Sequence, residues 1–489
     1  MIKNMKWLLL VSLTFMACNN DDSNDTPAEV PVVPGSAVFT KYVALGDSFA
    51  AGYSDNALFK KGQEGAYTNI LAQQFVAAGG GAFATPYMND NLGGLLLGGN
   101  VVAATRLYFN GSAPVNVAGK PTTEVTAHLT GTFGNLGVPG AKSYHLIAPG
   151  YGNVAGVATG AANPYFARFS SSPTTTVIAD AVSQSPTFFS LFIGGNDVLA
   201  YATSGGIGKD QTGNLNPATY SGNDITDPTV FKNIFSTLVT SLTANGAKGV
   251  VANLPYITSL PYFTTVPYNP APLTAALATQ LNAGYAVYNG GLKQMVTNKL
   301  LTQEEATRRT INFVAGNNAV VVVDSYLTNL SAYGLPSYRQ ATKEDLVVLS
   351  ARTFIGTTVG GDATKVNGLS VPLADNWVLT KDEVAEVKKA TDAYNIAIQA
   401  VATEKGLAFV DTKAVLTQLS SGGIRFGNFV MSSNYVTGGA FSLDGVHPSA
   451  RGYGLIANIF IDAINAKYGS TLRHVDLALY PIQFPKTIQ

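Results

Sequence analysis

The sequence predicts a doubly wound α/β protein, in which helices cover both faces of a parallel sheet. Short apolar runs lack the strict alternation of a half-exposed strand, which favours strands that are buried on both faces. Segments with helical spacing alternate with these runs along the chain. The 489 residues are 46% hydrophobic, which is ample for a large core.

Five apolar runs are the predicted strands. Each is short and rich in Val, Phe, Ile or Leu. They are Thr40–Leu45, Thr132–Leu136, Thr187–Ile193, Gly249–Asn253 and Leu407–Asp411.

Three segments are predicted helices because their apolar residues recur at steps of three, four or seven. Such steps place each set on one stripe, which predicts packing against the sheet or a neighbouring helix. The third segment starts near Ser449. The sets are Leu277, Leu281, Tyr288, Leu292 and Met295; Val384, Val387, Tyr394, Ile398 and Val401; and Ile456, Ile459, Phe460 and Ala463.

Three stretches depart from this alternation and are predicted insertions into one domain that spans residues 39–489. Residues 76–128 are rich in Gly, Ala and Asn, and residues 201–227 are rich in Gly and Asn. Residues 299–379 separate two predicted helices and hold a strand candidate at Ala319–Val323. We interpret them as insertions because the segments that could carry catalytic residues lie on both sides of them. The leucine-rich part of the first insertion is either a lid or a packed connection.

Residues 1–18 have the features of a targeting segment. Lys3 and Lys6 precede the apolar stretch Trp7–Met16, which is too short to span a bilayer as a helix. The segment ends at Cys18, the only cysteine, so no internal disulfide can form. It resembles a bacterial lipoprotein signal, which implies that Cys18 carries a lipid such as palmitate. An ordinary signal peptide with an incidental cysteine is the alternative.

Residues 19–38 show neither helical nor strand periodicity and are predicted to form a flexible tether. Asp21 and Asp22 resemble the export signal of surface lipoproteins in Bacteroidetes-type bacteria, although a solvated linker explains them equally well. We therefore expect a protein of the cell envelope that is held in the outer membrane by a lipid anchor. The sequence does not decide on which face of that membrane the protein lies.

The charge balance argues against nucleic acid as a partner. Lysine and arginine total 30, aspartate and glutamate total 30, and no basic run is present. No spacing of His, Cys and acidic residues indicates a metal site. The composition suits a secreted protein that meets neutral substrates, and we expect a monomer.

Gly46-Asp47-Ser48-Phe49 places a serine on the turn after the first predicted strand, where α/β folds carry their chemistry. A hydroxyl is a poor nucleophile until a neighbouring base accepts its proton. His447 lies three residues after Asp444, so the carboxylate can bind one ring N–H and leave the other nitrogen to face Ser48. Taken alone, His447 is more simply a capping or surface histidine before a helix.

Two further segments offer donors for the negative charge that develops on a carbonyl oxygen during ester hydrolysis. Gly137–Gly140 follows the second predicted strand, and a glycine there lets a backbone N–H approach a ligand closely. Gly194–Asp197 follows the third, and Asn196 offers a side-chain amide. Each segment alone is an ordinary turn. Together, the segments lie at or after predicted strand ends, which form a common crevice in an open sheet.

The four segments together resemble the SGNH/GDSL hydrolase family. The resemblance covers roughly residues 39–467 apart from the insertions. It implies a three-layer, flavodoxin-like α/β/α fold with a parallel sheet of about five strands. The matching blocks, in the family's order, are Gly46-Asp47-Ser48-Phe49, Asn135-Leu136-Gly137-Val138-Pro139-Gly140, Gly194-Gly195-Asn196-Asp197 and Asp444-Gly445-Val446-His447-Pro448.

The resemblance also implies roles for individual residues. Ser48 is the expected nucleophile, His447 the base and Asp444 the residue that orients the base. The Ser48 and Gly140 backbone N–H groups and the Asn196 side chain are the expected oxyanion hole. No metal or organic cofactor is implied. Phe49 stands where the family commonly has leucine.

We therefore expect a serine ester hydrolase of the esterase or lipase type that works through an acyl-serine intermediate. An acetylated carbohydrate, an acyl lipid or another small-molecule ester all remain open as substrates, as does acyl transfer to another alcohol. A non-catalytic glycan- or lipid-binding surface lipoprotein that kept the fold is the alternative. His145 is expected to be structural. The many Tyr and Phe residues are more simply core than a substrate platform. Aromatic residues in or near the insertions and loops are the alternative candidates for an acyl or sugar pocket, namely Tyr87, Tyr108, Tyr201, Tyr262 and Phe263.

Overall fold

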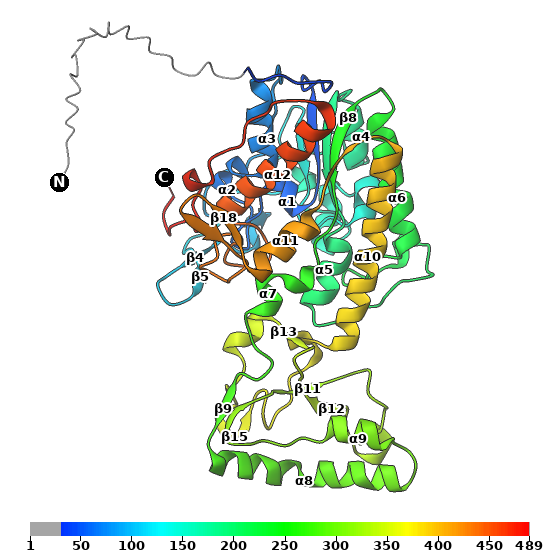
Figure 1. Ribbon diagram of the computed structural model, residues 1–489, viewed down its shortest axis with the longest axis vertical. Coiled ribbons are helices and arrows are strands. Elements are labelled where there is room, and N and C mark those ends of the chain that lie inside the picture. The colour runs from blue at the N-terminus through cyan, green and yellow to red at the C-terminus, as the bar shows by residue number, and fades with distance from the viewer. Residues whose placement is uncertain (1–30, 489) are drawn as a thin grey trace, which may run out of the picture.

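A five-stranded parallel sheet forms the centre of the protein, which a computed structural model describes over residues 31–488 (Figure 1). Each strand overlaps one of the five predicted runs, so the predicted strands and the α/β class are confirmed. Leu45 lies opposite Leu191 on one side and Leu136 on the other. From edge to edge the strands are β17 (Ala408–Val410), β8 (Lys248–Ala252), β7 (Phe188–Phe192), β1 (Tyr42–Gly46) and β6 (Asn135–Gly137).

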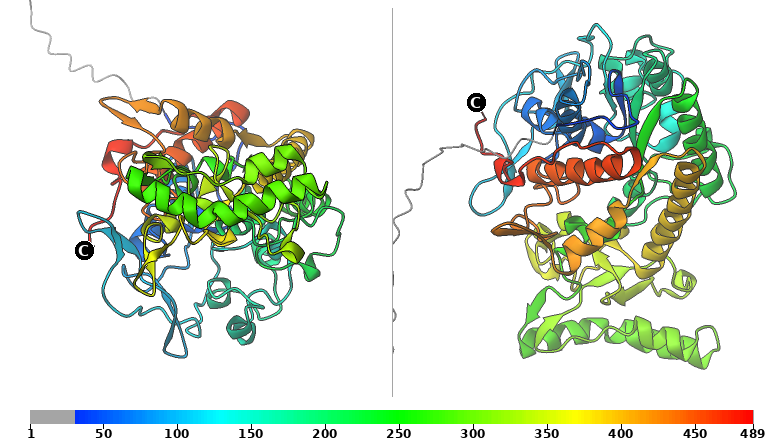
Figure 2. Two further views of the ribbon diagram at one scale, coloured as in Figure 1. Left: turned by 90° about the horizontal axis from the view of Figure 1, so that it is seen from below. Right: turned by 45° about the horizontal axis from the view of Figure 1, so that its top comes forward.

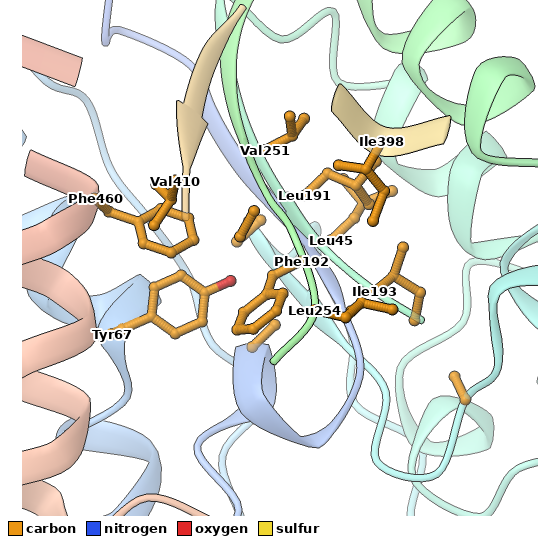
Figure 3. Close-up of a cluster of buried hydrophobic side chains, with 14 of the residues drawn as sticks. Leu45, Tyr67, Leu191, Phe192, Ile193, Val251, Leu254, Ile398, Val410 and Phe460 are labelled. Carbon is orange, nitrogen blue, oxygen red and sulfur yellow. The ribbon is translucent and has the colours of Figure 1, made fainter. Parts of the chain in front are cut away.

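Helices cover both faces of this sheet. Figure 3 shows Tyr67 and Phe460 on one side of the strands and Ile398 on the other. Full burial of a Phe or Ile side chain, such as Phe460 or Ile398, contributes about 1.5–3 kcal/mol to folding. The third predicted helix begins as expected, because Ser449 Oγ accepts the Gly452 N–H at 3.0 Å and caps it. The covering helices are α3 (Tyr67–Val76) and α12 (Ala450–Tyr468) on one face, and α4 (Val177–Val182), α6 (Pro228–Thr243) and α10 (Lys381–Glu404) on the other.

Besides the central sheet and its covering helices, the described chain holds further α-helices and two-stranded antiparallel pairs. The other α-helices are α1 (Ser48–Ala51), α2 (Lys60–Glu64), α5 (Asn196–Thr203), α7 (Pro261–Thr264), α8 (Ala275–Thr297), α9 (Gln303–Arg309) and α11 (Thr412–Ser421). The pairs are β2 (Leu95–Leu97) with β3 (Asn100–Ala103), β4 (Leu107–Phe109) with β5 (Pro114–Asn116), β9 (Ala271–Leu273) with β10 (Gly316–Asn318), β11 (Val321–Val323) with β12 (Tyr338–Gln340), β13 (Leu346–Val347) with β16 (Val378–Leu379), β14 (Thr358–Val359) with β15 (Asp362–Val366), and β18 (Ile424–Phe426) with β19 (Phe429–Met431).

The long helix α8 belongs to an outlying unit and not to the layers on the sheet. It lies at the end of the molecule farthest from the sheet (Figures 1 and 2). Leu281 and Leu292 pack in a separate apolar cluster with residues of α9 and β11, whereas Leu277 of the predicted stripe is 38% exposed. The predicted insertion at 299–379 is therefore too short, because the unit already begins near Ala271.

Strand β11 packs against both the outlying unit and the main core. Val321 of β11 packs into the outlying cluster, while its neighbours Val320 and Val322 pack into the main core. Successive side chains of a strand point to opposite faces, so this segment can contribute to both clusters at once. The strand candidate Ala319–Val323 is thus one of the segments that connect the unit to the sheet domain.

The first two predicted insertions each contribute buried residues. Leu95 of the first insertion is fully buried with Leu58 and Met88, which is the arrangement of a packed connection. The second is an extended loop after α5. Its buried Asp227 caps α6 by accepting the N–H groups of Thr229 and Val230.

The predicted signal segment, Cys18 and most of the predicted tether lie outside the described residues. The folded part begins earlier than the expected boundary at residue 39. Val33 donates its backbone N–H to Thr471 Oγ1, and Ser36 donates its own to the carbonyl of Tyr468, the last residue of α12. Among residues 31–488, no helix combines the length and the apolar character that crossing a bilayer requires.

Candidate active site

The loops that follow three adjacent strands meet at one end of the sheet. β7, β1 and β6 are neighbours, and because they run parallel their carboxyl ends lie at the same edge. Ser48 follows β1, Gly140 follows β6 and Asn196 follows β7. The order of the strands therefore gathers three predicted site residues that are far apart in the chain.

Ser48 is the first residue of the short helix α1 and is 5% exposed. The Asp47 side chain accepts the Phe49 N–H at 3.0 Å and caps this helix. Burial raises the pKa of Asp47 to about 7, although the Phe49 N–H and His447 oppose that rise. Position 46 has to be glycine, because a β-carbon at Gly46 would lie 2.4 Å from the Phe192 carbonyl oxygen. This close approach sets the turn that presents Ser48.

His447 links Ser48 to Asp444. Its Nε2 lies 2.9 Å from Ser48 Oγ, and its Nδ1 lies 2.9 Å from Asp444 Oδ2. An ionised carboxylate only accepts hydrogen bonds, so Nδ1 carries the proton and Nε2 accepts from the serine hydroxyl. The spacing of three residues is suitable because Asp444 Oδ1 also accepts the N–H groups of Val446 and His447, each at 2.8 Å, which closes a tight turn.

The pKa of Asp444 lies below its ordinary value. Burial by itself would raise this pKa, but the charge of a protonated His447 and the hydrogen bonds from His447 and Val446 outweigh burial. The carboxylate therefore stays charged at neutral pH and can hold the imidazole in one tautomer.

Two contacts around His447 are not evident in the sequence. Asn56 donates its backbone N–H to Asp444 Oδ2 at 2.9 Å, so this oxygen is shared with His447. The Tyr53 ring lies 4.6 Å from the His447 ring, measured between centroids. Asp55 and Asn56 have φ values of 51° and 61°, and this residue pair is a turn signal. Nothing local indicates that the turn faces a residue 388 positions away.

The loops that carry Asn196 and Gly140 are tied to each other. The Asn196 side chain donates one N–H to the Ala141 carbonyl at 3.0 Å, which leaves its second N–H for a ligand. Gly140 has a φ of 79°, a left-handed conformation that favours glycine even though a β-carbon would meet nothing within 4 Å. Ser143 donates its N–H and its hydroxyl to the buried Asp197 at 2.8 and 2.7 Å, which ties the same two loops again.

Two cavities meet at Asn196. The small cavity, of about 40 Å³, is lined by Ser48, Phe49, Phe192 and Asn196 among others. The large cavity, of about 730 Å³, extends from Gly140 and Asn196. Asn196 therefore stands between the serine and the larger space.

The aromatic residues that line these two cavities differ from those expected. None of the alternative candidates Tyr87, Tyr108, Tyr201, Tyr262 and Phe263 lines either cavity. Tyr201 and Phe263 are core residues instead. His145, expected to be structural, lines the large cavity. Across residues 31–488, no group of three His, Cys, Asp or Glu side chains is placed to hold a metal ion. The tyrosines of the large cavity are Tyr144, Tyr151, Tyr165 and Tyr220.

The family model for GDSL-like lipases and acylhydrolases matches residues 42–460. The chain belongs to this family. The match runs from β1 into α12 and includes all four predicted blocks. The protein is therefore a carboxylic ester hydrolase with the α/β fold of GDSL hydrolases. No curated protein matches the chain.

Solved structures of bacterial and metagenomic esterases and lipases are also similar to this GDSL hydrolase. An α/β hydrolase from the metagenome of Lake Arreo, Spain, is 11% identical, over 88% of this chain and 96% of its own, with a TM-score of 0.31. A variant of an acetyl-xylooligosaccharide esterase from Geobacillus stearothermophilus is 12% identical, over 88% and 96%, with a TM-score of 0.29. Phospholipase A1 from Streptomyces albidoflavus is 13% identical, over 88% and 100%, with a TM-score of 0.29. At identities and TM-scores this low, the similarity does not indicate a substrate.

Proposed function

We propose that this GDSL hydrolase cleaves its ester through Ser48, with His447 as general base and Asp444 as the carboxylate that orients the base. The observation that carries the proposal is the pair of 2.9 Å contacts that runs from Ser48 Oγ through His447 to Asp444. This order gives the hydroxyl a proton acceptor and gives the acceptor a fixed tautomer. The reaction is hydrolysis of an acyl or acetyl ester.

In the first half-reaction, His447 Nε2 accepts the Ser48 proton while Oγ attacks the ester carbonyl carbon. Negative charge gathers on the carbonyl oxygen, and we assign the Ser48 and Gly140 backbone N–H groups and the Asn196 amide to stabilise it. His447 then donates its proton to the departing alkoxide, so that an alcohol leaves and an acyl-serine remains. Asp444 stabilises the imidazolium that forms in between.

In the second half-reaction, a water molecule replaces the alcohol. His447 accepts a proton from the water as its oxygen attacks the acyl-serine carbonyl, and the same donors hold the oxyanion. The bond between the acyl carbon and Ser48 Oγ then breaks, Oγ takes the proton back from His447, and the carboxylic acid leaves. No residue outside this set is required to change its charge.

We expect a fluorophosphonate probe to label the native protein on Ser48. The probe carries an electrophilic phosphorus that only an activated hydroxyl attacks, and Ser48 is the hydroxyl that donates to His447. Intact mass spectrometry followed by peptide mapping locates the label. The heat-denatured protein serves as the control and stays unlabelled. A label on another residue would refute the assignment, and no label at all would favour a non-catalytic glycan- or lipid-binding surface protein.

We also infer that the enzyme sits at the cell envelope, held in the outer membrane by a lipid on Cys18. The support is the N-terminal pattern of Lys3 and Lys6, a short apolar stretch and a single cysteine. Cells fed a labelled palmitate should transfer label to the wild type, whereas Cys18→Ser should carry none and should move to the soluble fraction. Label that persists in Cys18→Ser would exclude this anchor.

A further inference from the structure

The large cavity begins at two of the residues assigned to the oxyanion hole and reaches the first insertion. Leu95 and Leu97 of the β2–β3 hairpin give it an aliphatic wall. Tyr144, His145 and Tyr151 add aromatic faces and polar groups. A surface of this mixed kind suits a ligand ring that has apolar faces and polar edges.

His145 is fixed in one orientation inside this wall. Its Nδ1 accepts the Lys142 backbone N–H at 3.0 Å. Its ring stacks on Tyr151, with centroids 4.4 Å apart and planes 11° from parallel. Burial, assisted by the charge of Lys142, lowers the pKa of His145 to about 4, so the ring is neutral at neutral pH. The ring is thus rigid and uncharged where it borders the cavity.

The fixed Nδ1 bond also determines which atom carries the proton. A neutral imidazole that accepts at Nδ1 must carry its hydrogen on Nε2. Within residues 31–488, neither His145 Nε2 nor the Tyr144 hydroxyl has a protein hydrogen-bond partner, and both residues line the large cavity. Two polar groups are therefore left for water or a ligand. An alkyl chain laid against them would remove that water without replacing its hydrogen bonds.

The small cavity limits the acyl part of the substrate. Its volume is about 40 Å³, and a single water molecule already needs about 10–15 Å³ on this scale. A separate distal cavity of about 60 Å³ lies beyond it, and Phe49 and Phe192 line both. A long acyl chain would have to displace this aromatic partition, whereas an acetyl group fits in front of it.

We propose that the large cavity binds the alcohol part of the substrate, that this alcohol is a carbohydrate, and that the small cavity takes an acetyl group. The proposal rests on the assigned role of Ser48 and deepens it. Asn196 lines both cavities and so marks where the ester carbonyl lies between its two halves. His145 determines specificity, because its Nε2–H donates to a sugar hydroxyl. The enzyme is then a deacetylase of carbohydrate esters and not a lipase.

The test compares four substrate classes with wild-type enzyme: peracetylated xylose and glucose, p-nitrophenyl acetate, p-nitrophenyl octanoate, and didecanoyl phosphatidylcholine. We expect kcat/KM for p-nitrophenyl acetate to exceed that for the octanoate by about tenfold or more. The sugar acetates should be hydrolysed, and the phospholipid should not. Faster turnover of the octanoate or the phospholipid would overturn the proposal in favour of a lipid substrate.

Matched variants at position 145 separate specificity from a structural role. His145→Asn keeps an acceptor near the Lys142 N–H but is too short to donate into the cavity. It should lower kcat/KM for sugar acetates about tenfold while changing that for p-nitrophenyl acetate no more than about twofold. His145→Gln, which restores a donor at the Nε2 position, should recover most of the loss. Equal losses on both substrates would show that His145 is only structural and overturn its proposed role.

Phe49→Leu tests the acyl side independently. The smaller side chain should open the small cavity toward the distal one and raise the octanoate-to-acetate ratio of kcat/KM several-fold. An unchanged ratio would overturn the proposal that Phe49 limits the length of the acyl group.

Failure of the carbohydrate site and failure of the proposed function give different results. Turnover of p-nitrophenyl acetate that depends on Ser48, without turnover of sugar acetates, refutes the carbohydrate site alone. Absence of all turnover and of fluorophosphonate labelling refutes the proposed function and the carbohydrate site together.

Discussion

The Ser48→Ala variant is expected to lose about 10⁴- to 10⁶-fold in kcat/KM for p-nitrophenyl acetate while keeping its fold. The substitution removes the atom that we propose forms the acyl-serine, and the remaining donors would then only assist attack by water. The fold should persist because, within residues 31–488, the Ser48 side chain hydrogen-bonds only to His447, and the cap of α1 comes from Asp47. Ester hydrolysis and thermal unfolding, measured on the same preparation, check both halves of this expectation.

Ser190→Ala is the matched control for that experiment. Ser190 is a fully buried serine in β7 whose hydroxyl bonds the Tyr42 hydroxyl at 2.7 Å. Its loss leaves a buried phenol without this partner, which should cost about 1–3 kcal/mol of unfolding free energy. Activity should be retained, because neither residue lines the cavities at Ser48. If Ser48→Ala kept wild-type turnover, the nucleophile would have to be another group.

The sheet is predictable from the sequence because burial on both faces leaves a local signature. Thr187–Ile193 has no polar alternation, and β7 lies at the middle of the sheet. The meeting of Ser48 and His447, which are 399 positions apart, has no such signature. It is predictable only from chemical roles, since a nucleophilic serine needs a base and few histidines are available.

Other features cannot be predicted from the sequence because they depend on which partner a surface packs against. The stripe of α8 resembles that of α10, yet one lies in the outlying unit and the other on the sheet. A stripe shows that a face is buried but not by which partner. Val33 and Ser36 dock through backbone atoms, which every residue type carries, so composition cannot distinguish them from a free tether. The His145–Tyr151 stack is likewise a contact between loops.

The His447→Ala variant should lose as much activity as Ser48→Ala, about 10⁴- to 10⁶-fold, and the double variant should lose no more than either. Ser48 without a base and His447 without a serine are both inactive in this mechanism. The losses of transition-state stabilisation in the two single variants should therefore not add in the double variant. Measuring kcat/KM for the wild type, both single variants and the double variant completes a double-mutant cycle. Losses that multiplied in the double variant would mean that the two residues act in separate steps, against the 2.9 Å contact between them.

Asp444→Asn extends the cycle to the third residue and should cost about 10⁴-fold. The introduced amide has two orientations, and each loses something. With its nitrogen toward His447 Nδ1, it forces the proton onto Nε2, which can then no longer accept from Ser48, and it also opposes the Asn56 N–H. In the other orientation, the amide nitrogen takes the place of Oδ1 and faces the N–H groups of Val446 and His447, which opens the turn. Near-wild-type kcat/KM in Asp444→Asn would show that the turn alone positions His447 and that the carboxylate charge is not needed.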